Sequence, residues 1–179
     1  MRVLGIIFRS DLKWTSNTEN IIKRASNKLW TLRRLKGLGA QSQDLVDIYI
    51  KQCRSILEFA VPAWQGAITV AERLDIERVQ KGALHIILGD QYENYQNALH
   101  ITNLEDLESR RNKLCFKFAQ KAEKDDKHKK WFKPKSKNPT RQFNDKYWKP
   151  IAKTGRLKKS PICHLTNILN EHYQNPNQK

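Results

Sequence analysis

Apolar residues recur along this chain in two patterns, one typical of a buried strand and one of amphipathic helices. Residues 3–8 are almost continuously apolar, which favours a strand covered on both faces of a sheet. After a turn-like stretch, residues 22–35 carry apolar side chains at steps of three and four, which predicts a helix that ends at Gly37 and Gly39. The predicted core face of this helix consists of Ile22, Ala25, Leu29, Leu32 and Leu35.

Two further helices follow from the same periodicity. One begins near Ser42, an N-cap candidate, and stops at Pro62. Its inward residues are predicted to be Leu45, Tyr49, Cys53, Ile56 and Leu57. The next helix begins after Thr69 and closes at Gly89. Its inward residues are predicted to be Leu74, Val79, Ala83, Ile86 and Ile87.

The middle of the chain continues as helix, and the pattern is then lost. A short apolar segment holds Tyr95, Ala98 and Leu99, and Asn103 is predicted to cap a longer helix. The inward positions of that longer helix are Leu104, Leu107, Leu114, Phe118 and Ala122. Residues 124–159 are rich in Lys, Pro and Asn and are predicted to be extended or disordered.

Helical order is predicted to return at the end of the chain. Ser160 and Pro161 form an N-cap and first-turn pair, followed by Ile162, Leu165, Ile168 and Leu169 on one face. The predicted fold class is therefore mainly α, with one N-terminal strand and a basic, poorly structured C-terminal extension. The predicted divisions are a terminal strand over 1–14, a helical domain over 15–123, a basic aromatic extension over 124–159 and a short helix with a tail over 160–179.

Charge adds a partner class to this picture. The 179 residues contain 34 Lys and Arg against 18 Asp and Glu, a formal net charge of +16. Residues 1–36 carry a net +7 and residues 121–159 a net +11, whereas residues 37–120 carry a net −2. Because so much positive charge repels itself in a compact fold, a nucleic acid is the first expected partner and an anionic membrane surface the second.

Several classes of protein are disfavoured by what the chain contains. No apolar stretch approaches the roughly 20 residues that span a bilayer, and residues 3–8 are too short for a signal peptide. We therefore expect an intracellular protein, cytoplasmic or nuclear. With a nucleic acid preferred over a membrane surface, we expect no membrane partner. The three cysteines are widely spaced and form no CxxC pair, so they are expected to be buried or incidental thiols. The five histidines are expected to be structural or solvated.

Several motifs together resemble the end of the reverse transcriptase of non-LTR (LINE-type) retrotransposons, the jockey-like group in particular. They are, in chain order, LGIIFRSDLKW (4–14), IIKRASNKLWTLRRLKGLG (21–39), LVDIYIKQCRSILEFAVPAW (45–64), LDIERVQKGALHIILG (74–89), ALHITNLEDLESRRNKLCFKFAQKA (98–122) and RLKKSPICHLTNILNE (156–171). The resemblance covers almost the whole chain in the family's order and spacing.

The resemblance implies a fold and a role for each part. The strand that includes Leu4 and Gly5 would close the palm sheet beside the primer terminus, and the helices after it would form a thumb-like bundle. The fingers and the other palm strands would lie upstream of Met1, so the chain looks like a truncated piece whose partners include the missing palm and fingers region.

The resemblance also bears on catalysis. Polymerases of this family hold two Mg²⁺ ions with aspartates, including a pair in a Tyr/Phe-Ala-Asp-Asp turn. That turn is not in this sequence, and the only Asp-Asp pair, Asp125-Asp126, has no flanking apolar strand to hold it rigid. The chain is therefore predicted to carry no catalytic residue, no metal site and no cofactor of its own, although the parent family is an RNA-directed DNA polymerase.

Binding residues can still be assigned. The helix after the strand carries basic residues mostly off its apolar face, and the thumb resemblance implies that they follow the phosphate backbone of a template-primer duplex. They are Lys23, Arg24, Lys28, Arg33, Arg34 and Lys36. The alternative is an ordinary solvated face.

The basic extension offers a second group of candidates, Lys129, Lys130, Trp131 and Lys133. Basic residues interleaved with aromatic ones suit single-stranded RNA, because charges neutralise phosphates while rings stack on bases. The alternative is a linker whose aromatic residues, among them Phe132, Phe143, Tyr147 and Trp148, pack back onto the helices. Trp14, Trp30 and Trp64 are expected in the core or at its rim.

The sequence thus predicts a piece of a retrotransposon polymerase without its catalytic palm that binds RNA or an RNA/DNA duplex without sequence preference. Two alternatives remain open at this point. In the first, the chain is a decayed retroelement remnant without activity. In the second, it is a basic helical interaction protein of the host.

Overall fold

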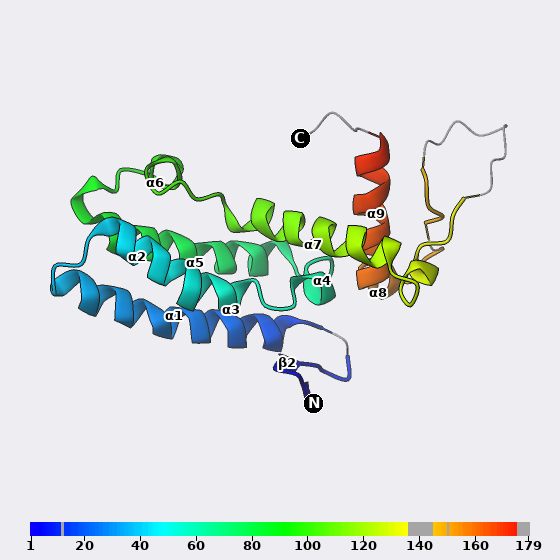
Figure 1. Cartoon of the computed structure of the whole chain (residues 1–179). Helices are drawn as coiled ribbons and strands as arrows, with labels where there is room; N and C mark the ends of the chain where they lie inside the picture. The colour runs from blue at the N-terminus through cyan, green and yellow to red at the C-terminus, as the bar shows by residue number, and fades with distance from the viewer. Residues whose placement is uncertain (12, 136–144, 150, 175–179) are drawn as a thin grey trace. The chain divides into compact units, whose positions relative to one another are not determined.

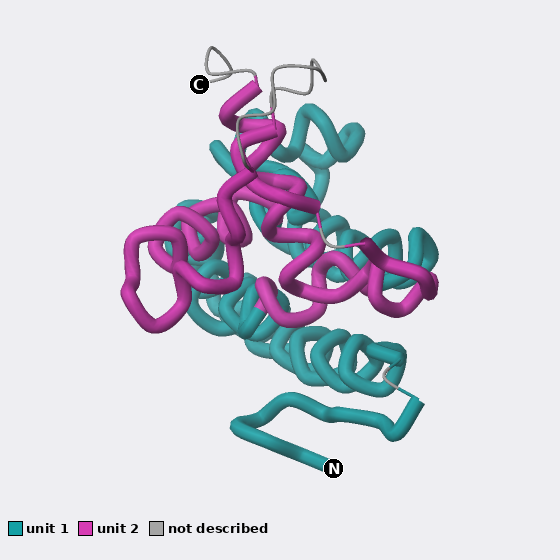
Figure 2. Tube along the Cα trace, turned by 90° about the vertical axis from the view of Figure 1, so that its right-hand side faces the viewer, with its two compact units in different colours: residues 1–60, 68–111 teal, residues 61–67, 112–179 magenta. Residues whose placement is uncertain are grey.

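The computed structural model describes residues 1–11, 13–135, 145–149 and 151–174, and it is mainly helical with a short two-stranded sheet. The expected helical fold class is confirmed at this level. The chain forms two compact units, residues 1–60 with 68–111 and residues 61–67 with 112–179, which Figure 2 distinguishes by colour. Within the described residues, no helix is both long and apolar enough to cross a membrane.

The first unit opens with a hairpin, so the single strand expected over residues 3–8 is wrong. Strands β1 (Arg2–Val3) and β2 (Ile6–Ile7) pair antiparallel, and Leu4 and Gly5 form the turn between them. Both turn residues have positive φ angles, 47° and 87°, which is the pattern of a type I′ hairpin turn. Leu4 is 88% exposed at the tip of the turn, although β2 itself contacts α1, where the Ile7 N–H donates to Asn17 Oδ1 at 3.1 Å.

Helix α1 (Thr15–Gly37) follows the predicted periodicity closely. Ile21, Ala25, Leu29 and Leu32 are buried, and the predicted Ile22 is only half-buried beside them. This face packs against α5 (Val70–Leu88) and against the helical segment that includes α3 (Ser55–Leu57). Figure 1 shows these helices of the first unit side by side.

The second predicted helix forms with an altered winding. Helix α2 (Ser42–Ile48) passes into a π-helical segment, η1 (Tyr49–Arg54), and then into α3. Its buried residues Leu45, Tyr49, Cys53 and Leu57 are spaced by four, which overshoots an α-helical turn of 3.6 residues. The wider π turn offsets this drift and keeps the four side chains on the core side.

Helix α5 begins with a capping box in which the Thr69 hydroxyl accepts from the Glu72 N–H while the Glu72 carboxylate accepts from the Thr69 N–H. Ile76, Val79, Ala83 and Ile87 are buried. The expected inward position of Leu74 is wrong, because this side chain is 54% exposed. The helix ends at Leu88 with Gly89 as its C-cap, at the predicted place, and the short η2 (Gly89–Gln91) follows.

The next two helices are capped by short polar side chains. Helix α6 (Tyr95–Ile101) has Asn94 as its N-cap. Helix α7 (Leu107–Lys124) begins later than predicted, because Asp106 accepts from the Ser109 N–H whereas Asn103 adopts a positive φ of 52°. The expected inward position of Phe118 on α7 is also wrong, since 39% of this residue is exposed.

The second unit gathers α4 (Val61–Trp64), residues 112–124 of α7, η3 (Lys129–Trp131), α8 (Gly155–Lys158) and α9 (Pro161–Gln174). Helix α9 begins at the predicted place, with the Ser160 hydroxyl accepting from the Cys163 N–H at 3.4 Å. Trp64 is fully buried, and Cys163, Leu165 and Leu169 face the interior of this unit.

The described part of the basic extension, which is predicted to be extended or disordered, contains an extended bridge and a short helix. Pro134 and Tyr147 form a β-bridge, and Phe132 and Tyr147 are buried, 3% and 6% exposed. Helix α8 is a further ordered element within residues 124–159. The prediction for residues 136–144 and 150, including Phe143, lies outside the described residues.

Candidate nucleic-acid interface

The candidate interface of the first unit is the solvent-facing side of α1. Of the six predicted basic residues on this helix, five have exposed side chains: Lys23, Arg24, Lys28, Arg33 and Arg34. None of the five forms an ion pair with a residue that the structure describes. Glu19 is the only acidic residue within α1. The solvent-exposed part of this helix therefore carries a large excess of positive charge without ion pairs among the described residues.

Other basic residues of the same unit are used differently. Arg54 and Arg110 both pair with Glu58, at 3.3 and 3.0 Å, and Arg73 pairs with Glu108 at 2.9 Å. The pairs of Arg110 and Arg73 connect α7 to other helices, whereas Arg54 and Glu58 lie one turn apart in the same helical segment. All three arginines thus have a carboxylate partner. The carboxylates of Glu58 and Glu108 thus pair with arginines that lie outside α1.

Lys36 does not belong to the exposed group. Its ammonium donates to the carbonyl oxygens of Ile86 and Ile87, at 2.7 and 3.2 Å, and the residue is half-buried. These are carbonyls of the last turn of α5, which have no partner within their own helix. Because a cation at a helix C-terminus also interacts favourably with the helix dipole, Lys36 has a structural role in the first unit.

Trp30 is a residue that the sequence interpretation misplaced. It was expected in the core or at its rim, yet it is 62% exposed on the outer side of α1. The Arg34 guanidinium lies over its ring, 5.7 Å from the ring centroid. The signal for this position was present in the sequence, since 100° per residue places position 30 nearly opposite the face formed by Ala25 and Leu32.

The second predicted group lies in the other compact unit, and two of its four side chains contact neighbouring side chains. Lys129 pairs with Asp126 at 2.6 Å, and Trp131 packs edge-on against His128 with ring centroids 4.6 Å apart. Lys130 and Lys133 are exposed. Phe132 and Tyr147 are buried, as the alternative of aromatic residues packing onto the helices predicted, while Trp148 is 51% exposed.

The remaining candidates from the sequence are the predicted primer-terminus residues and the Asp-Asp pair. Leu4 and Gly5, predicted for a primer-terminus strand, are the two turn residues of the hairpin. Asp125 accepts from the His128 ring and from the Lys127 N–H, and these hydrogen bonds lower the pKa of its carboxyl. Among the described residues, no group of three or more His, Cys, Asp or Glu is placed to hold a metal ion.

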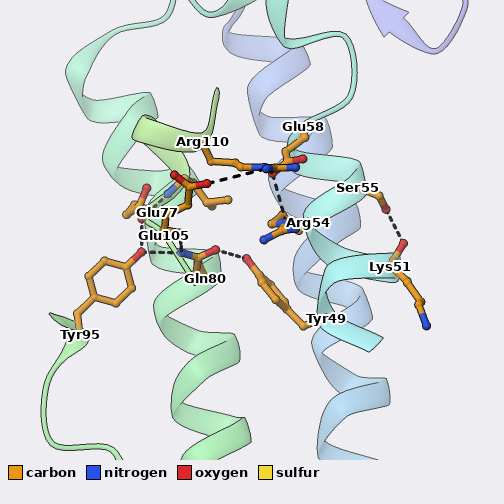
Figure 3. A network of polar contacts seen from close by, with 11 residues as sticks. Tyr49, Lys51, Arg54, Ser55, Glu58, Glu77, Gln80, Tyr95, Glu105 and Arg110 are labelled. Atoms are coloured by element: carbon orange, nitrogen blue, oxygen red, sulfur yellow. Dashed lines mark hydrogen bonds and ion pairs between the residues drawn. The ribbon is translucent and has the colours of Figure 1, made fainter. Parts of the chain in front are cut away.

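A buried polar network crosses the interior of the first unit (Figure 3). The Tyr49 hydroxyl donates to Gln80 Oε1 at 2.7 Å, and Gln80 Nε2 donates to the Tyr95 hydroxyl at 2.9 Å and to the Glu105 carbonyl at 3.0 Å. The Tyr95 hydroxyl in turn donates to Glu77. Burial, together with the Glu77 carboxylate, raises the pKa of Tyr95 well above its ordinary value, so this phenol stays protonated.

A shallow pocket of about 210 Å³ lies beside this network. It is lined by Val70, Arg73, Leu74, Glu77, Tyr95, Asp106 and Glu108. Its carboxylates already serve the fold, because Glu77 accepts from the Leu107 N–H, Asp106 from the Ser109 N–H and Glu108 from Arg73. The pocket lining that the structure describes therefore contains no carboxylate without a hydrogen-bond partner that would suggest a general acid or base.

The cysteines are buried thiols, as expected. Burial raises the pKa of Cys53 to about 11, so this side chain is a thiol at neutral pH and has little nucleophilic character. Comparison with known proteins found no matching family model, no matching curated protein and no matching solved structure.

Proposed function

We propose that the first unit binds RNA or an RNA/DNA duplex through the exposed basic residues of α1. The observation that carries this proposal is the set of five exposed cations on one helix without an ion-pair partner among the described residues. Their mutual repulsion raises the free energy of the folded unit, and a polyanion would relieve it. Neutralising phosphates would also release condensed counterions, which favours binding at low salt.

The expected recognition is of backbone and shape. Lys and Arg side chains on a helix exterior contact phosphate oxygens, which position a protein on a helix but carry no sequence information. An RNA strand adds 2′-hydroxyls and the A-like geometry that proteins recognise by shape. We therefore expect little preference among sequences of equal length and structure.

The resemblance to LINE-type reverse transcriptases gives this binding a context. In that family the helices after the palm form the thumb that holds the template-primer, and we propose the same role for the first unit. DNA synthesis in the family requires a palm and fingers region with its Mg²⁺ ions, and that region is the protein partner that this proposal expects. The proposal does not rest on the second unit, where Lys129 is paired and two aromatic side chains are buried.

The test is the salt dependence of binding to a labelled RNA/DNA hybrid, measured by fluorescence anisotropy. The full chain is compared with a variant in which Lys23, Arg24, Lys28, Arg33 and Arg34 are all changed to Gln. Each phosphate contact contributes about −0.9 to the slope of log K against log salt on a duplex, so the variant should lose up to about 4.5 units of slope. Circular dichroism should show unchanged helicity, because all five side chains are exposed.

A matched control removes the same charge elsewhere. Five other exposed lysines, Lys51, Lys81, Lys117, Lys121 and Lys124, are changed to Gln together. The proposal predicts a clearly smaller loss of slope for this control. Equal losses in the two variants would show that affinity follows total charge, and the remnant and host-protein alternatives would then be favoured.

A further inference from the structure

Trp30 is the most exposed of the five tryptophans in the chain. It is 62% exposed, whereas Trp148 is 51% exposed, Trp64 is 1% exposed and the other two are partly buried. A large aromatic surface in water is unfavourable unless a partner covers it, and tryptophan is frequent where binding energy is concentrated. We therefore expect a binding partner to cover the Trp30 ring.

The neighbours of Trp30 on the helix exterior favour a nucleic acid. Positions 23, 27, 30 and 34 are spaced by four, three and four, so Lys23, Asn27, Trp30 and Arg34 form one stripe along α1. All four are exposed. The stripe is about 16 Å long at 1.5 Å per residue, and it combines two cations with one ring. Its positive charge is complementary to a phosphate backbone.

The Trp30 ring makes a cation–π contact with Arg34 of the same stripe. The Arg34 guanidinium lies over the ring at 5.7 Å, a cation–π distance one helical turn away. This contact places a phosphate-binding group directly beside an exposed indole. Because the guanidinium covers one face of the indole, a base would stack on the other face, and Arg34 would remain beside it as a phosphate-binding group.

We infer that Trp30 and Arg34 form a stacking site for an unpaired base, so that α1 prefers a duplex with a single-stranded overhang to a blunt duplex. This inference rests on the proposed function of α1 and adds its preferred substrate. Bases inside a duplex are stacked on one another and leave no face for the indole, whereas a base beyond the duplex end has a free face. Stacking on an aromatic side chain tolerates any base, because every base has a π face.

The experiment compares two labelled RNA/DNA hybrids of equal duplex length, one blunt and one with an overhang of six unpaired ribonucleotides. Dissociation constants are measured for the full chain and for Trp30→Ala. Removing one stacked base is expected to weaken binding to the overhang hybrid by about 5-fold to about 150-fold. Binding to the blunt hybrid should change by less than about two-fold, since the charges that contact phosphates are retained.

Two further variants separate stacking from other roles of the side chain. Trp30→Phe keeps a ring and should retain most of the overhang preference, whereas Trp30→Leu keeps an apolar side chain without a ring and should lose it. The inference is overturned if the full chain binds both hybrids equally, or if Trp30→Leu retains the preference, which would indicate an apolar wedge in place of stacking.

Failure of this inference can be distinguished from failure of the proposed function. If both hybrids bind equally and the five-fold Gln variant of α1 still loses its salt slope, α1 binds duplex without a stacking site. If the full chain binds neither hybrid, both proposals are wrong. Thermal unfolding of each Trp30 variant checks that an exposed substitution has left the fold intact.

Discussion

The side-chain amide of Asn170 makes hydrogen bonds to both backbone polar groups of Tyr147. The Tyr147 N–H donates to Asn170 Oδ1 at 2.8 Å, and Asn170 Nδ2 donates to the Tyr147 carbonyl at 2.9 Å. Asn170 is fully buried in α9, and Tyr147 is 6% exposed. One side chain of the last helix thus pairs with the backbone N–H and carbonyl of a segment of the basic extension that has little regular secondary structure of its own.

Replacing Asn170 should therefore destabilise the second unit. Asn170→Ala leaves a buried N–H and a buried carbonyl of Tyr147 without their partners, and each such group costs about 1 to 3 kcal/mol. Urea unfolding and amide hydrogen exchange at residue 147 measure the effect. Asn167→Ala, an exposed change on the same helix, is the control and should stay within about 0.5 kcal/mol of the original chain. Equal effects of the two changes would contradict the role given to the Asn170 amide.

A second contact to the same segment is expected to depend on pH. The Glu123 carboxylate accepts from Lys146 at 2.7 Å, from Tyr173 at 2.9 Å and from the Tyr147 hydroxyl. Burial opposes ionisation of Glu123, but these hydrogen bonds outweigh it and lower its pKa below the ordinary value of 4.5.

A lowered pKa in the folded state fixes the sign of the effect. The stabilisation by Glu123 is complete above pH 4.5 and is lost as pH falls through the lower pKa of the folded state. Glu123→Gln should cost about 1 to 3 kcal/mol at neutral pH, and the free energy of unfolding of the variant should depend less on pH below 4.5. Chemical unfolding at a series of pH values measures this. The exposed Glu171→Gln should leave the original pH dependence in place.

The buried network of the first unit predicts energetic coupling between Tyr49 and Gln80. Gln80→Leu leaves the buried Tyr49 hydroxyl without its acceptor and should cost about 1 to 3 kcal/mol. Adding Tyr49→Phe removes that unpaired hydroxyl, so the double variant should be more stable than the sum of the single effects by about 0.5 to 3 kcal/mol. A double-mutant cycle by denaturant unfolding checks this, and additive effects would show that the hydrogen bond contributes nothing measurable.

Lys36 and Lys28 lie on the same helix but are predicted to act differently. Lys36→Gln removes the ammonium that caps α5 and should lower the free energy of unfolding by about 1 kcal/mol, with little change in the salt slope of hybrid binding. Lys28→Gln should have the reverse pattern, a stability change within about 0.5 kcal/mol and a loss of slope near 0.9. Unfolding and anisotropy measurements on both variants check this pair, and equal losses of slope would assign Lys36 to the interface.

The helices and much of their core could be predicted from the sequence, because helix formation depends on contacts within one or two turns. The apolar spacing from Ala25 to Leu32 and the Ser160-Pro161 start are local features of this kind, and the structure confirms both. The cap of α7 was predicted three residues too early, since Asn103 and Asp106 are both capable caps and only the path of the chain selects between them.

The candidate site could be predicted only in part. Five of the six basic residues of α1 are exposed as their helical positions imply, whereas Lys36 reaches α5, about fifty residues further along the chain. A single helix cannot show which of its polar residues another helix will bind. Trp30 is predicted in the core or at its rim, whereas it is 62% exposed, as its position on the helix opposite Ala25 and Leu32 implies.

The sequence by itself thus determined the helical class, the periodic core faces and the concentration of positive charge on α1. The tertiary structure alone decided that residues 2–7 form a hairpin, that Lys36 caps α5 and that the buried Tyr147 forms hydrogen bonds with Asn170 and Glu123. The physical reason is the range of the interactions. Helical periodicity and capping act between residues up to four apart, whereas burial of a lysine, a tyrosine or a strand depends on side chains brought from distant parts of the chain.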